Sequence, residues 1–445
     1  MTDIKFDILP QRSAVMAGHN TEVFALVRAQ APSRPIGGEN DRMPLNLSLV
    51  LDRSGSMSGK PLEEAKRCAA YIVDQLDSRD RVSIVVYDNR VEVLVPSTQV
   101  TDKLGIKQLI SGIHSGGSTN LHGGWEEGAK QCLIATSGEY LSRVLLLSDG
   151  CANVGLTEVD LIAQRCAKMV EAGVSTSTYG LGTHFNEELM VEMAKSGSGQ
   201  SYYGESAEDL LDPFQEEFSL MSALCARQVK LTLSAPIGVF FTLLNDYRHL
   251  TDTTWQIPDL AYEGEAWALV RLSVSDDVPT NPSTGDIEIL RAFLSYVDVE
   301  SDASDTRSYT LRLPRIDASA WAAITADDRV TGRLQEIRVG QLQSQVREAA
   351  LLQDWNRVDQ LVAQAEEEAG DNAWVKEALQ TLKRYARRRD RDRMSKEALY
   401  MSRKMSHRLA EHDEDYRSYS VSAESSKAEY LRKKREQGKR MDRPD

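Results

Sequence analysis

From residue 45 onward, the chain alternates short apolar runs with longer amphipathic segments. The apolar runs predict strands covered on both faces at residues 45–51, 82–87, 144–147 and 174–181, with shorter strands at 91–95 and 201–203. Apolar positions spaced by three and four predict helices at residues 61–76, 103–110, 121–135, 158–172, 186–194 and 207–225. This alternation indicates a doubly wound α/β domain with a mostly parallel sheet over residues 43–225.

The segments on both sides of this domain show a period of two, which is typical of antiparallel strands. Residues 1–42 contain two such strands, at 4–9 and 22–29, followed by a linker at 30–42 that carries two prolines and a Gly-Gly pair. Residues 226–317 contain further strands at 229–234, 238–243, 266–274, 287–297 and 308–313. These strands predict an antiparallel β-sandwich, with the α/β domain inserted between two of its strands.

The last third of the chain returns to a helical period. Helices are expected at 318–353, 355–369 and 372–411, and they form a helical hairpin or bundle over residues 318–413. Its packing stripe consists of Leu342, Val346, Ala349, Ala350 and Leu361. Residues 414–445 are rich in Ser, Lys and Arg and poor in large apolar residues, so we expect this tail to be disordered until bound.

Composition is that of a globular protein, with 41% hydrophobic and 27% charged residues in a chain of 445. No stretch approaches the roughly 18 apolar residues of a membrane span, and the N-terminus has no basic region followed by an apolar one. Five cysteines without C-x-x-C spacing are expected to be buried thiols rather than disulfides or zinc ligands. These features predict a cytoplasmic protein.

Charge is distributed unevenly along the chain. The net charge is −14, yet residues 376–445 carry more Lys and Arg than Asp and Glu, so the rest of the chain is strongly acidic. An acidic body argues against nucleic-acid binding except through the basic tail. We favour a solvated helix face and a disordered end as the reason for the basic segment.

Three polar clusters follow predicted strands or precede helices of the α/β domain. Asp52, Ser54 and Ser56 come directly after the strand at 45–51, Thr119 lies in the loop Gly116-Gly117-Ser118-Thr119-Asn120, and Asp149 lies in Ser148-Asp149-Gly150. Ligands of open α/β sheets collect beyond the carboxyl ends of the strands, where all three clusters are expected. Carboxylate and hydroxyl oxygens are hard ligands that suit Mg²⁺, with Mn²⁺ or Ca²⁺ as alternatives.

The order D-R-S-G-S-M, then G-G-S-T-N, then L-L-L-S-D-G resembles the metal-ion-dependent adhesion site of von Willebrand factor type A (VWA) domains, which have a Rossmann-like fold. The resemblance implies Ser54, Ser56 and Thr119 as hydroxyl ligands, with Asp52 and Asp149 on the metal directly or through water. It also implies an Asp or Glu of a partner protein at an open metal position. The whole-chain arrangement is similar to bacterial cytosolic VWA proteins, which implies partners such as chaperone-type ATPases, kinases and phosphatases, or a defence system.

Two other function classes compete with this metal-dependent binding module or scaffold. A metal-dependent phosphoesterase would use the ion as a Lewis acid, but neither an H-E-x-x-H motif nor a nucleophile elbow occurs, so we expect no enzyme. A subunit of a larger assembly would act mainly through its helical C-terminal region, with a vestigial metal site. The absence of a G-x-x-x-x-G-K-[ST] loop excludes a P-loop ATPase.

Several residues near the clusters have a structural and a functional interpretation. We favour ordinary loop or helix roles for His114 and His122, core packing for Trp125 and turn chemistry for Asn153, while Arg53 is expected at the rim of the site.

Overall fold

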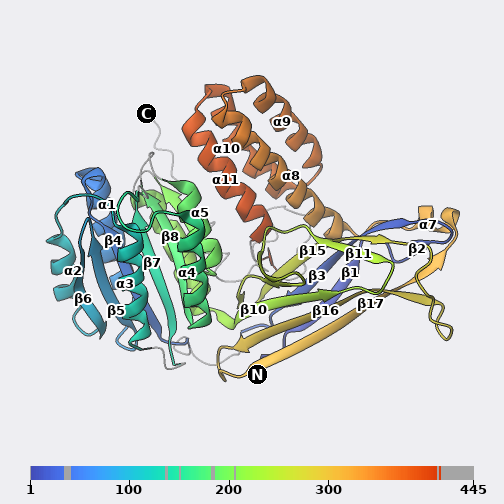
Figure 1. The fold of residues 1–445 in the computed structure, drawn as a ribbon, viewed down its shortest axis with the longest axis horizontal. Helices are drawn as coiled ribbons and strands as arrows, with labels where there is room; N and C mark the ends of the chain where they lie inside the picture. The colour runs from blue at the N-terminus through green and yellow to red at the C-terminus, as the bar shows by residue number, and fades with distance from the viewer. Residues whose placement is uncertain are drawn as a thin grey trace, which may run out of the picture. The chain divides into compact units, whose positions relative to one another are not determined.

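The computed structural model of the protein describes residues 2–34, 42–135, 139–149, 152–181, 186–204, 207–407 and 410–411. The described chain forms two compact units, one built from residues 36–223 and the other from the residues before 36 and from 224 onward (Figure 1). The predicted disordered tail at 414–445 and most of the predicted linker lie outside the described residues. No helix of the described chain is long and apolar enough to cross a membrane.

Residues 36–223 form an α/β unit around a six-stranded sheet of order β6-β5-β4-β7-β8-β9. The strands are β4 (Leu45–Asp52), β5 (Arg81–Tyr87), β6 (Val91–Gln99), β7 (Leu141–Ser148), β8 (Val174–Leu181) and β9 (Ser201–Gly204). Every neighbouring pair is parallel except β5 and β6. All eight residues of the central strand β4 are buried, because the sheet is covered on both faces. The doubly wound α/β prediction is confirmed.

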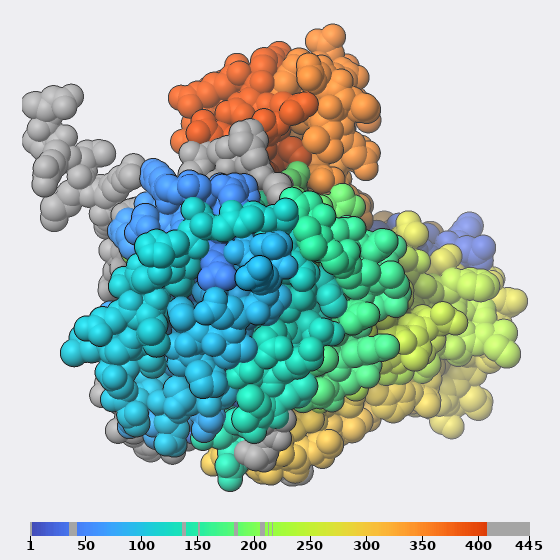
Figure 2. All heavy atoms as spheres, turned by 60° about the vertical axis from the view of Figure 1, so that its left-hand side comes forward, coloured from blue at the N-terminus to red at the C-terminus, as the bar shows by residue number. Residues whose placement is uncertain are grey.

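Helices connect these strands and form the outer surface of the unit. They are η1 (Gly55–Met57), α1 (Lys60–Gln75), α2 (Lys103–Ser111), α3 (Leu121–Leu133), α4 (Val159–Glu171), α5 (Glu187–Ser196) and α6 (Ala207–Ser222). In the space-filling view, segments coloured from blue to green make up the surface of this unit that faces the viewer (Figure 2). Helix α6 ends at Ser222 and not at the predicted residue 225, because the backbone is extended from Leu224, where β10 begins.

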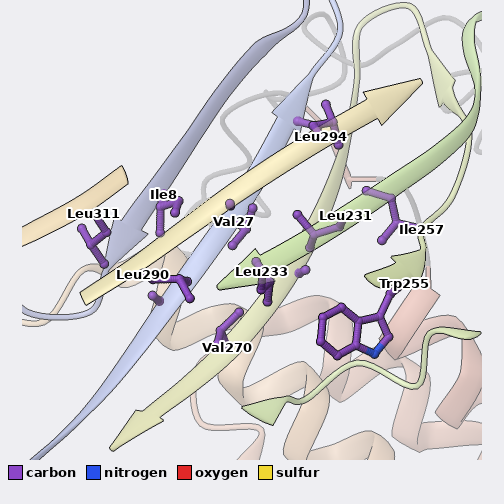
Figure 3. Packing of buried hydrophobic residues seen from close by; sticks show 14 of the residues in the cluster. Ile8, Val27, Leu231, Leu233, Trp255, Ile257, Val270, Leu290, Leu294 and Leu311 are labelled. Carbon is purple, nitrogen blue, oxygen red and sulfur yellow. The ribbon is translucent and has the colours of Figure 1, made fainter. Parts of the chain in front are cut away.

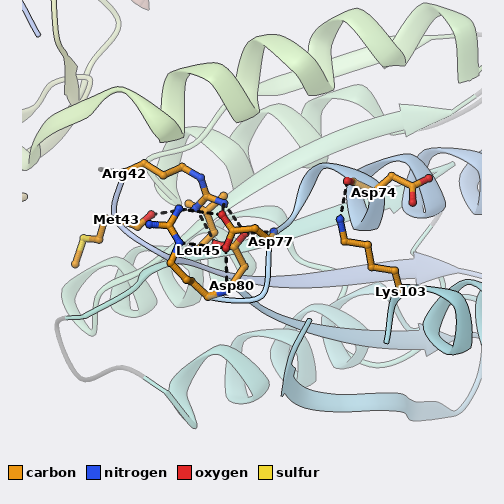
Figure 4. Close-up of polar contacts among 8 residues, drawn as sticks. Arg42, Met43, Leu45, Asp74, Asp77, Asp80 and Lys103 are labelled. Carbon is orange, nitrogen blue, oxygen red and sulfur yellow. Dashed lines mark hydrogen bonds and ion pairs between the residues drawn. The ribbon is translucent and has the colours of Figure 1, made fainter. Parts of the chain in front are cut away.

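A buried ion pair fixes the start of β4, at the end of the strand away from Asp52. Asp80 is fully buried and accepts hydrogen bonds from both terminal nitrogens of Arg42, at 2.7 and 2.5 Å, and from the backbone N–H of Leu45 at 2.8 Å (Figure 4). Asp77 lies beside them and accepts from Arg42 at 3.0 Å. The register of the central strand is therefore set by a charge pair as well as by its apolar residues.

The second unit contains a β-sandwich of two sheets, whose strand pairs are antiparallel except for the short pair β2 and β17. One sheet contains β1 (Lys5–Pro10), β3 (Thr21–Gln30), β15 (Gly264–Val274), β11 (Val239–Leu243) and β18 (Ala410–Glu411). The other contains β12 (Arg248–Thr251), β13 (Thr254–Gln256), β10 (Leu224–Ser234), β16 (Asp286–Asp298), β17 (Ser304–Ile316), β2 (Val15–Met16) and β14 (Leu260–Ala261). The α/β unit enters the chain between β3 of one sheet and β10 of the other.

The sandwich core lies between these two sheets. Val27 and Val270 from the first sheet pack in one cluster with Leu231 and Leu290 from the second (Figure 3). Trp255 on β13 is also buried in this cluster. Apolar residues at alternate positions of each strand thus meet at the centre, as period-two patterning requires.

In the described residues 318–407, the helical region has five helices where the sequence predicted three. They are α7 (Ala318–Ala323), α8 (Asp328–Leu351), α9 (Trp355–Glu368), α10 (Ala373–Arg388) and α11 (Arg391–His407). The predicted helix at 318–353 is interrupted because Asp327 caps α8, accepting from the N–H groups of Arg329 and Val330. The predicted helix at 372–411 is interrupted at Arg389, which adopts a left-handed conformation with φ 54°.

The predicted packing stripe of this region is confirmed. Val346, Ala349, Ala350 and Leu361 are buried in the helical core, and Leu342 packs against it.

Candidate metal centre

The first polar cluster forms a tight turn at the carboxyl end of β4. The Asp52 side chain accepts a hydrogen bond from the backbone N–H of Ser54 at 2.8 Å, which folds the chain back directly after the strand. The hydroxyl oxygens of Ser54 and Ser56 then lie 3.1 Å apart. Asp52 and Ser54 are buried, whereas Ser56 is exposed. The turn therefore offers oxygen ligands with one side open to solvent.

Asp52 is a buried carboxylate with polar neighbours on both oxygens. Its second oxygen accepts from the hydroxyl of Ser148 at 2.6 Å and from that of Tyr87 at 3.3 Å. Burial raises the pKa of Asp52 from its ordinary value of 3.8 to about 6, the hydrogen bonds from Ser148 and Ser54 oppose this shift, and the charge of Asp149 adds to it. Two buried carboxylates therefore lie close enough to repel each other, and a cation between them would stabilise their ionised forms.

The second cluster is held against the first by backbone hydrogen bonds. The N–H of Gly55 donates to the carbonyl of Gly117 at 2.8 Å, and the N–H of Gly116 donates to the carbonyl of Arg53 at 2.6 Å. A Cβ at Gly116 would meet an Asp88 carboxylate oxygen at 2.1 Å, so a larger residue here would require the Asp88 side chain to move. The loop that carries Thr119 is thus fixed beside the Asp52 turn.

Residues 153 and 154, which follow the third cluster, are tied to Thr119. The N–H groups of Asn153 and Val154 donate to the Thr119 carbonyl at 3.1 and 3.2 Å, and the Asn153 side chain accepts from the Thr119 N–H at 2.8 Å. Both Thr119 and Asp149 are buried. The structure therefore gathers the three predicted loops at one edge of the sheet, while Gly150 lies outside the described residues.

Two side chains that the sequence did not assign to the site support the centre, although Ser148 was named as part of the third cluster. Tyr87 and Ser148 end the strands on either side of β4, and each donates to Asp52. Each lies at the carboxyl end of an apolar run, and this position is the feature of the sequence that could have indicated it. Asp88 was also missed; it lies 3.3 Å from the Arg53 side chain and accepts from the Arg90 N–H.

The neighbouring residues have mainly structural roles. The Trp125 ring is fully buried and its N–H donates to Thr176 at 3.0 Å, in agreement with core packing. Asn153 has the turn role just described, and His114 is exposed. His122 is buried beside Trp125, and burial lowers the pKa of its imidazole. Arg53 is half-buried and also pairs with Glu92 at 3.0 Å.

The donor set suits a hard divalent cation. Two carboxylates and three hydroxyls supply only oxygen, the element that Mg²⁺ and Ca²⁺ prefer. No group of three or more His, Cys, Asp or Glu side chains arranged for a metal occurs in the described parts of the chain. A cation at this centre would therefore depend on the hydroxyls of Ser54, Ser56 and Thr119 as well as on the carboxylates.

Comparison with known proteins identifies the fold of this unit. Residues 46–217 match the family model of the von Willebrand factor type A domain. A curated relative, "Uncharacterized protein sll0103" of Synechocystis sp., is 31% identical over 185 residues, which are 41% of this chain and 42% of the relative. The chain thus matches less than half of that relative's length. Residues 46–217 form a VWA domain, a class that generally mediates protein–protein interaction and is typically non-enzymatic.

Two solved structures resemble the chain over most of its length. A von Willebrand factor type A protein from Catenulispora acidiphila superimposes with a TM-score of 0.66 at 16% identity, covering 86% of this chain and 89% of its own. The ArnB paralog VWA2 from Sulfolobus acidocaldarius gives a TM-score of 0.60 at 18% identity, covering 91% and 99%. At these identities the likeness concerns the fold alone.

Proposed function

We propose that the VWA domain binds a partner protein through a divalent cation held by Asp52, Ser54, Ser56, Thr119 and Asp149. The observation that carries this proposal is the pair of buried acidic side chains, Asp52 and Asp149, beside two hydroxyls 3.1 Å apart. Burying two like charges together is unfavourable unless a cation offsets them. The chemistry supplied by the bound ion is electrophilic attraction for one further oxygen ligand.

The chemistry of the centre favours a carboxylate from the partner. Asp52 and Asp149 together match the charge of a divalent ion, and the neutral hydroxyls do not reduce it further. Ser56 is the exposed member of the set, so an Asp or Glu side chain of a partner would enter on its side. Mg²⁺ is the ion we favour, with Mn²⁺ and Ca²⁺ as alternatives.

The site supports a binding role better than catalysis. A phosphoesterase would need a general base or nucleophile beside the ion. His122 is buried, with its Nε2 lacking a hydrogen bond to any described group, and His114 is exposed on a loop. Turnover of a phosphoester by the purified protein with Mg²⁺ or Mn²⁺, lost on Asp52→Ala, would favour the enzyme instead.

The cellular setting belongs to the same proposal. The protein would act in the cytoplasm of a bacterium, in a complex with a chaperone-type ATPase, a kinase or phosphatase, or a component of a defence system. The β-sandwich and helical region would serve as a scaffold or as a second interaction surface. An assembly role carried mainly by the helical region is the competing function.

A pull-down with matched variants tests the proposal. The Ser54→Ala/Ser56→Ala variant removes both hydroxyls of the turn, and the Ser58→Ala/Ser115→Ala variant removes two exposed hydroxyls beside it that lie 3.4 Å apart. We expect wild type and the Ser58/Ser115 variant to retain the partner in Mg²⁺ and to release it in EDTA. The Ser54/Ser56 variant is expected to lose most of it in both conditions.

A truncation before α7, at about residue 318, separates the two functions. We expect partial loss of the partner, because both the metal centre and the helices contribute. Full retention by the Ser54/Ser56 variant together with full loss by the truncation would show that the helices act alone and would contradict the metal bridge.

A further inference from the structure

The β-sandwich unit contains a small pocket far in sequence from the metal centre. Its volume is about 170 Å³. Its walls come from the loop after β1, the start of β3 and the segment around α7, and the lining residues are Gln11, Arg12, Ala14, Glu22, Val23, Phe24, Trp321 and Ala326. The metal-dependent binding proposed above does not involve this pocket.

Backbone hydrogen bonds hold the pocket walls together. The N–H of Gln11 donates to the carbonyl of Phe24 at 2.7 Å, which ties the β1 loop to β3. The N–H of Asp327 donates to the carbonyl of Gln11 at 2.8 Å, which ties the same loop to the start of α8. The pocket is therefore formed before any ligand arrives, as small-molecule sites usually are.

Arg12 is a cation placed for binding at this pocket. Its guanidinium carbon lies over the Trp321 ring, 4.0 Å from the ring centroid, which is a cation–π contact. A cation–π contact uses the charge of the guanidinium and leaves N–H donors available for a ligand. Within the described chain, Arg12 forms no ion pair; Glu22 lines the same pocket but lies beyond ion-pair distance.

Trp321 adds a second donor. Its indole N–H is buried and has no acceptor among the described residues. Buried N–H groups are rarely left unpaired, because an unmade hydrogen bond is costly away from water. A carboxylate paired with Arg12 would lie close to this unpaired donor, because Arg12 lies over the same indole.

The remaining walls are apolar. Ala14, Val23 and Phe24 line the pocket, and the first two are almost fully buried. Drug-sized ligands need pockets of roughly 300–1,000 Å³, so this pocket suits a group about as large as one amino-acid residue. We propose that it binds the α-carboxylate end of a small apolar residue, supplied either as a free amino acid or as the C-terminus of a peptide.

The Glu22 side chain, which lines the pocket, should bind a free amino acid and the C-terminus of a peptide differently. A free amino acid carries an ammonium group that the Glu22 carboxylate attracts, whereas the last residue of a peptide carries a neutral amide there. A preference for leucine over N-acetyl-leucine, lost on Glu22→Gln, identifies a free amino acid. The reverse preference identifies a peptide end.

Titration of the full-length protein by NMR tests this pocket, with the indole N–H signals as the readout. The Trp321 signal is assigned by its loss in Trp321→Phe. Leucine, N-acetyl-leucine and N-acetyl-leucinamide, which lacks the carboxylate, are added up to about 10 mM, since ligands this small bind with dissociation constants of about 1 mM. We expect the two carboxylates to shift the Trp321 signal saturably and the amide to leave it unchanged.

Two variants separate binding from structure. Arg12→Gln is expected to weaken binding of the carboxylate at least tenfold, and the exposed control Arg387→Gln to leave it unchanged. Trp321→Phe keeps an aromatic ring beside Arg12 and removes the indole N–H, so it should also weaken binding, which is followed here by the ligand's own signals. Equal binding of the amide, no shift of the Trp321 signal, or unchanged affinity in Arg12→Gln would each overturn the proposal.

Discussion

Replacing Asp52 with asparagine should separate the stability of the metal-free fold from its ability to bind a cation. Asp52→Asn keeps the shape of the side chain and removes its charge. Asparagine can still accept from the Ser54 N–H, and the hydroxyls of Ser148 and Tyr87 can rotate to accept from the new amide. The same groups can therefore stay hydrogen-bonded to residue 52, with the two hydroxyls accepting where they previously donated.

The magnitude follows from the pKa of Asp52, which rises from 3.8 to about 6 on folding. The folded protein holds this proton more tightly than the unfolded chain, so the contribution to stability is complete below pH 3.8. It is lost as the pH rises through 6. At pH 8 the ionised carboxylate should cost the metal-free fold about 3 kcal/mol relative to a neutral group, as an order of magnitude. The asparagine variant avoids this cost.

Fluorine NMR can follow unfolding of the VWA domain alone within the full chain. Trp125 is the single tryptophan of residues 36–223, so the signal of a fluorotryptophan there reports this unit. In EDTA at pH 8, Asp52→Asn should unfold at an equal or higher urea concentration than wild type, and the difference should shrink at pH 4. Saturating Mg²⁺ should stabilise wild type by about 3 kcal/mol at a hundredfold excess over its dissociation constant, and leave the variant unchanged.

Two results would refute this reasoning. If Asp52→Asn lost several kcal/mol in EDTA at pH 8, the carboxylate would be a structural group rather than one held ready for a cation. If Mg²⁺ stabilised wild type and variant equally, the ion would bind elsewhere.

Three further predictions concern the scaffold of the VWA domain. Asp80→Asn removes the buried charge that pairs with Arg42 and leaves the partly exposed Asp77 as the remaining carboxylate on that guanidinium, so urea unfolding should show a loss of about 2 kcal/mol in this unit. A loss below about 0.5 kcal/mol would mean that the pair is dispensable. Gly124→Ala places a Cβ 2.3 Å from the Tyr87 ring, and we expect the fold to lose about 1–3 kcal/mol of stability. Because Tyr87 donates to Asp52, Mg²⁺ binding measured by calorimetry should also weaken. Burial raises the pKa of the Cys132 thiol to about 12, so iodoacetamide at pH 8 should leave it unmodified in the native protein and label it after denaturation, as read by mass spectrometry.

The glycine prediction has a matched control. Gly112 ends α2 in a right-handed helical conformation, and a Cβ there would meet its nearest neighbour at 3.4 Å. Gly112→Ala should therefore change neither stability nor Mg²⁺ binding by a measurable amount. Equal effects of the two alanine substitutions would show that the Tyr87 contact is not their cause.

The fold class was predictable because apolar periodicity directly reflects burial. The run at 45–51 is apolar throughout, and β4 is buried throughout; the period-two segments became the strands of the sandwich. The short strands β2, β12, β13 and β14 were not predicted, because so few residues show no period. The left-handed Arg389 that separates α10 from α11 was also missed, since sequence seldom indicates a positive φ at a residue other than glycine.

The candidate site was predictable for a different reason. Strand ends of a parallel sheet share one edge, so Asp52 and Asp149 could be placed near each other from the order of the strands alone. Their supporting side chains, Tyr87 and Ser148, could not be chosen in this way, because the sequence does not say which residue at a strand end faces its neighbour. Their contacts depend on the register of β5 and β7 against β4.

The most direct test of the central claim is the anomalous diffraction of Mn²⁺ in crystals of the protein. We predict one strong peak within about 2.2 Å of the hydroxyl oxygens of Ser54 and Ser56, with Thr119 and the two carboxylates around it directly or through water. The same crystals of Ser54→Ala/Ser56→Ala should lack this peak. A well-ordered Asp52 turn without bound Mn²⁺, or a peak elsewhere on the chain, would contradict the assignment of these residues as a cation site.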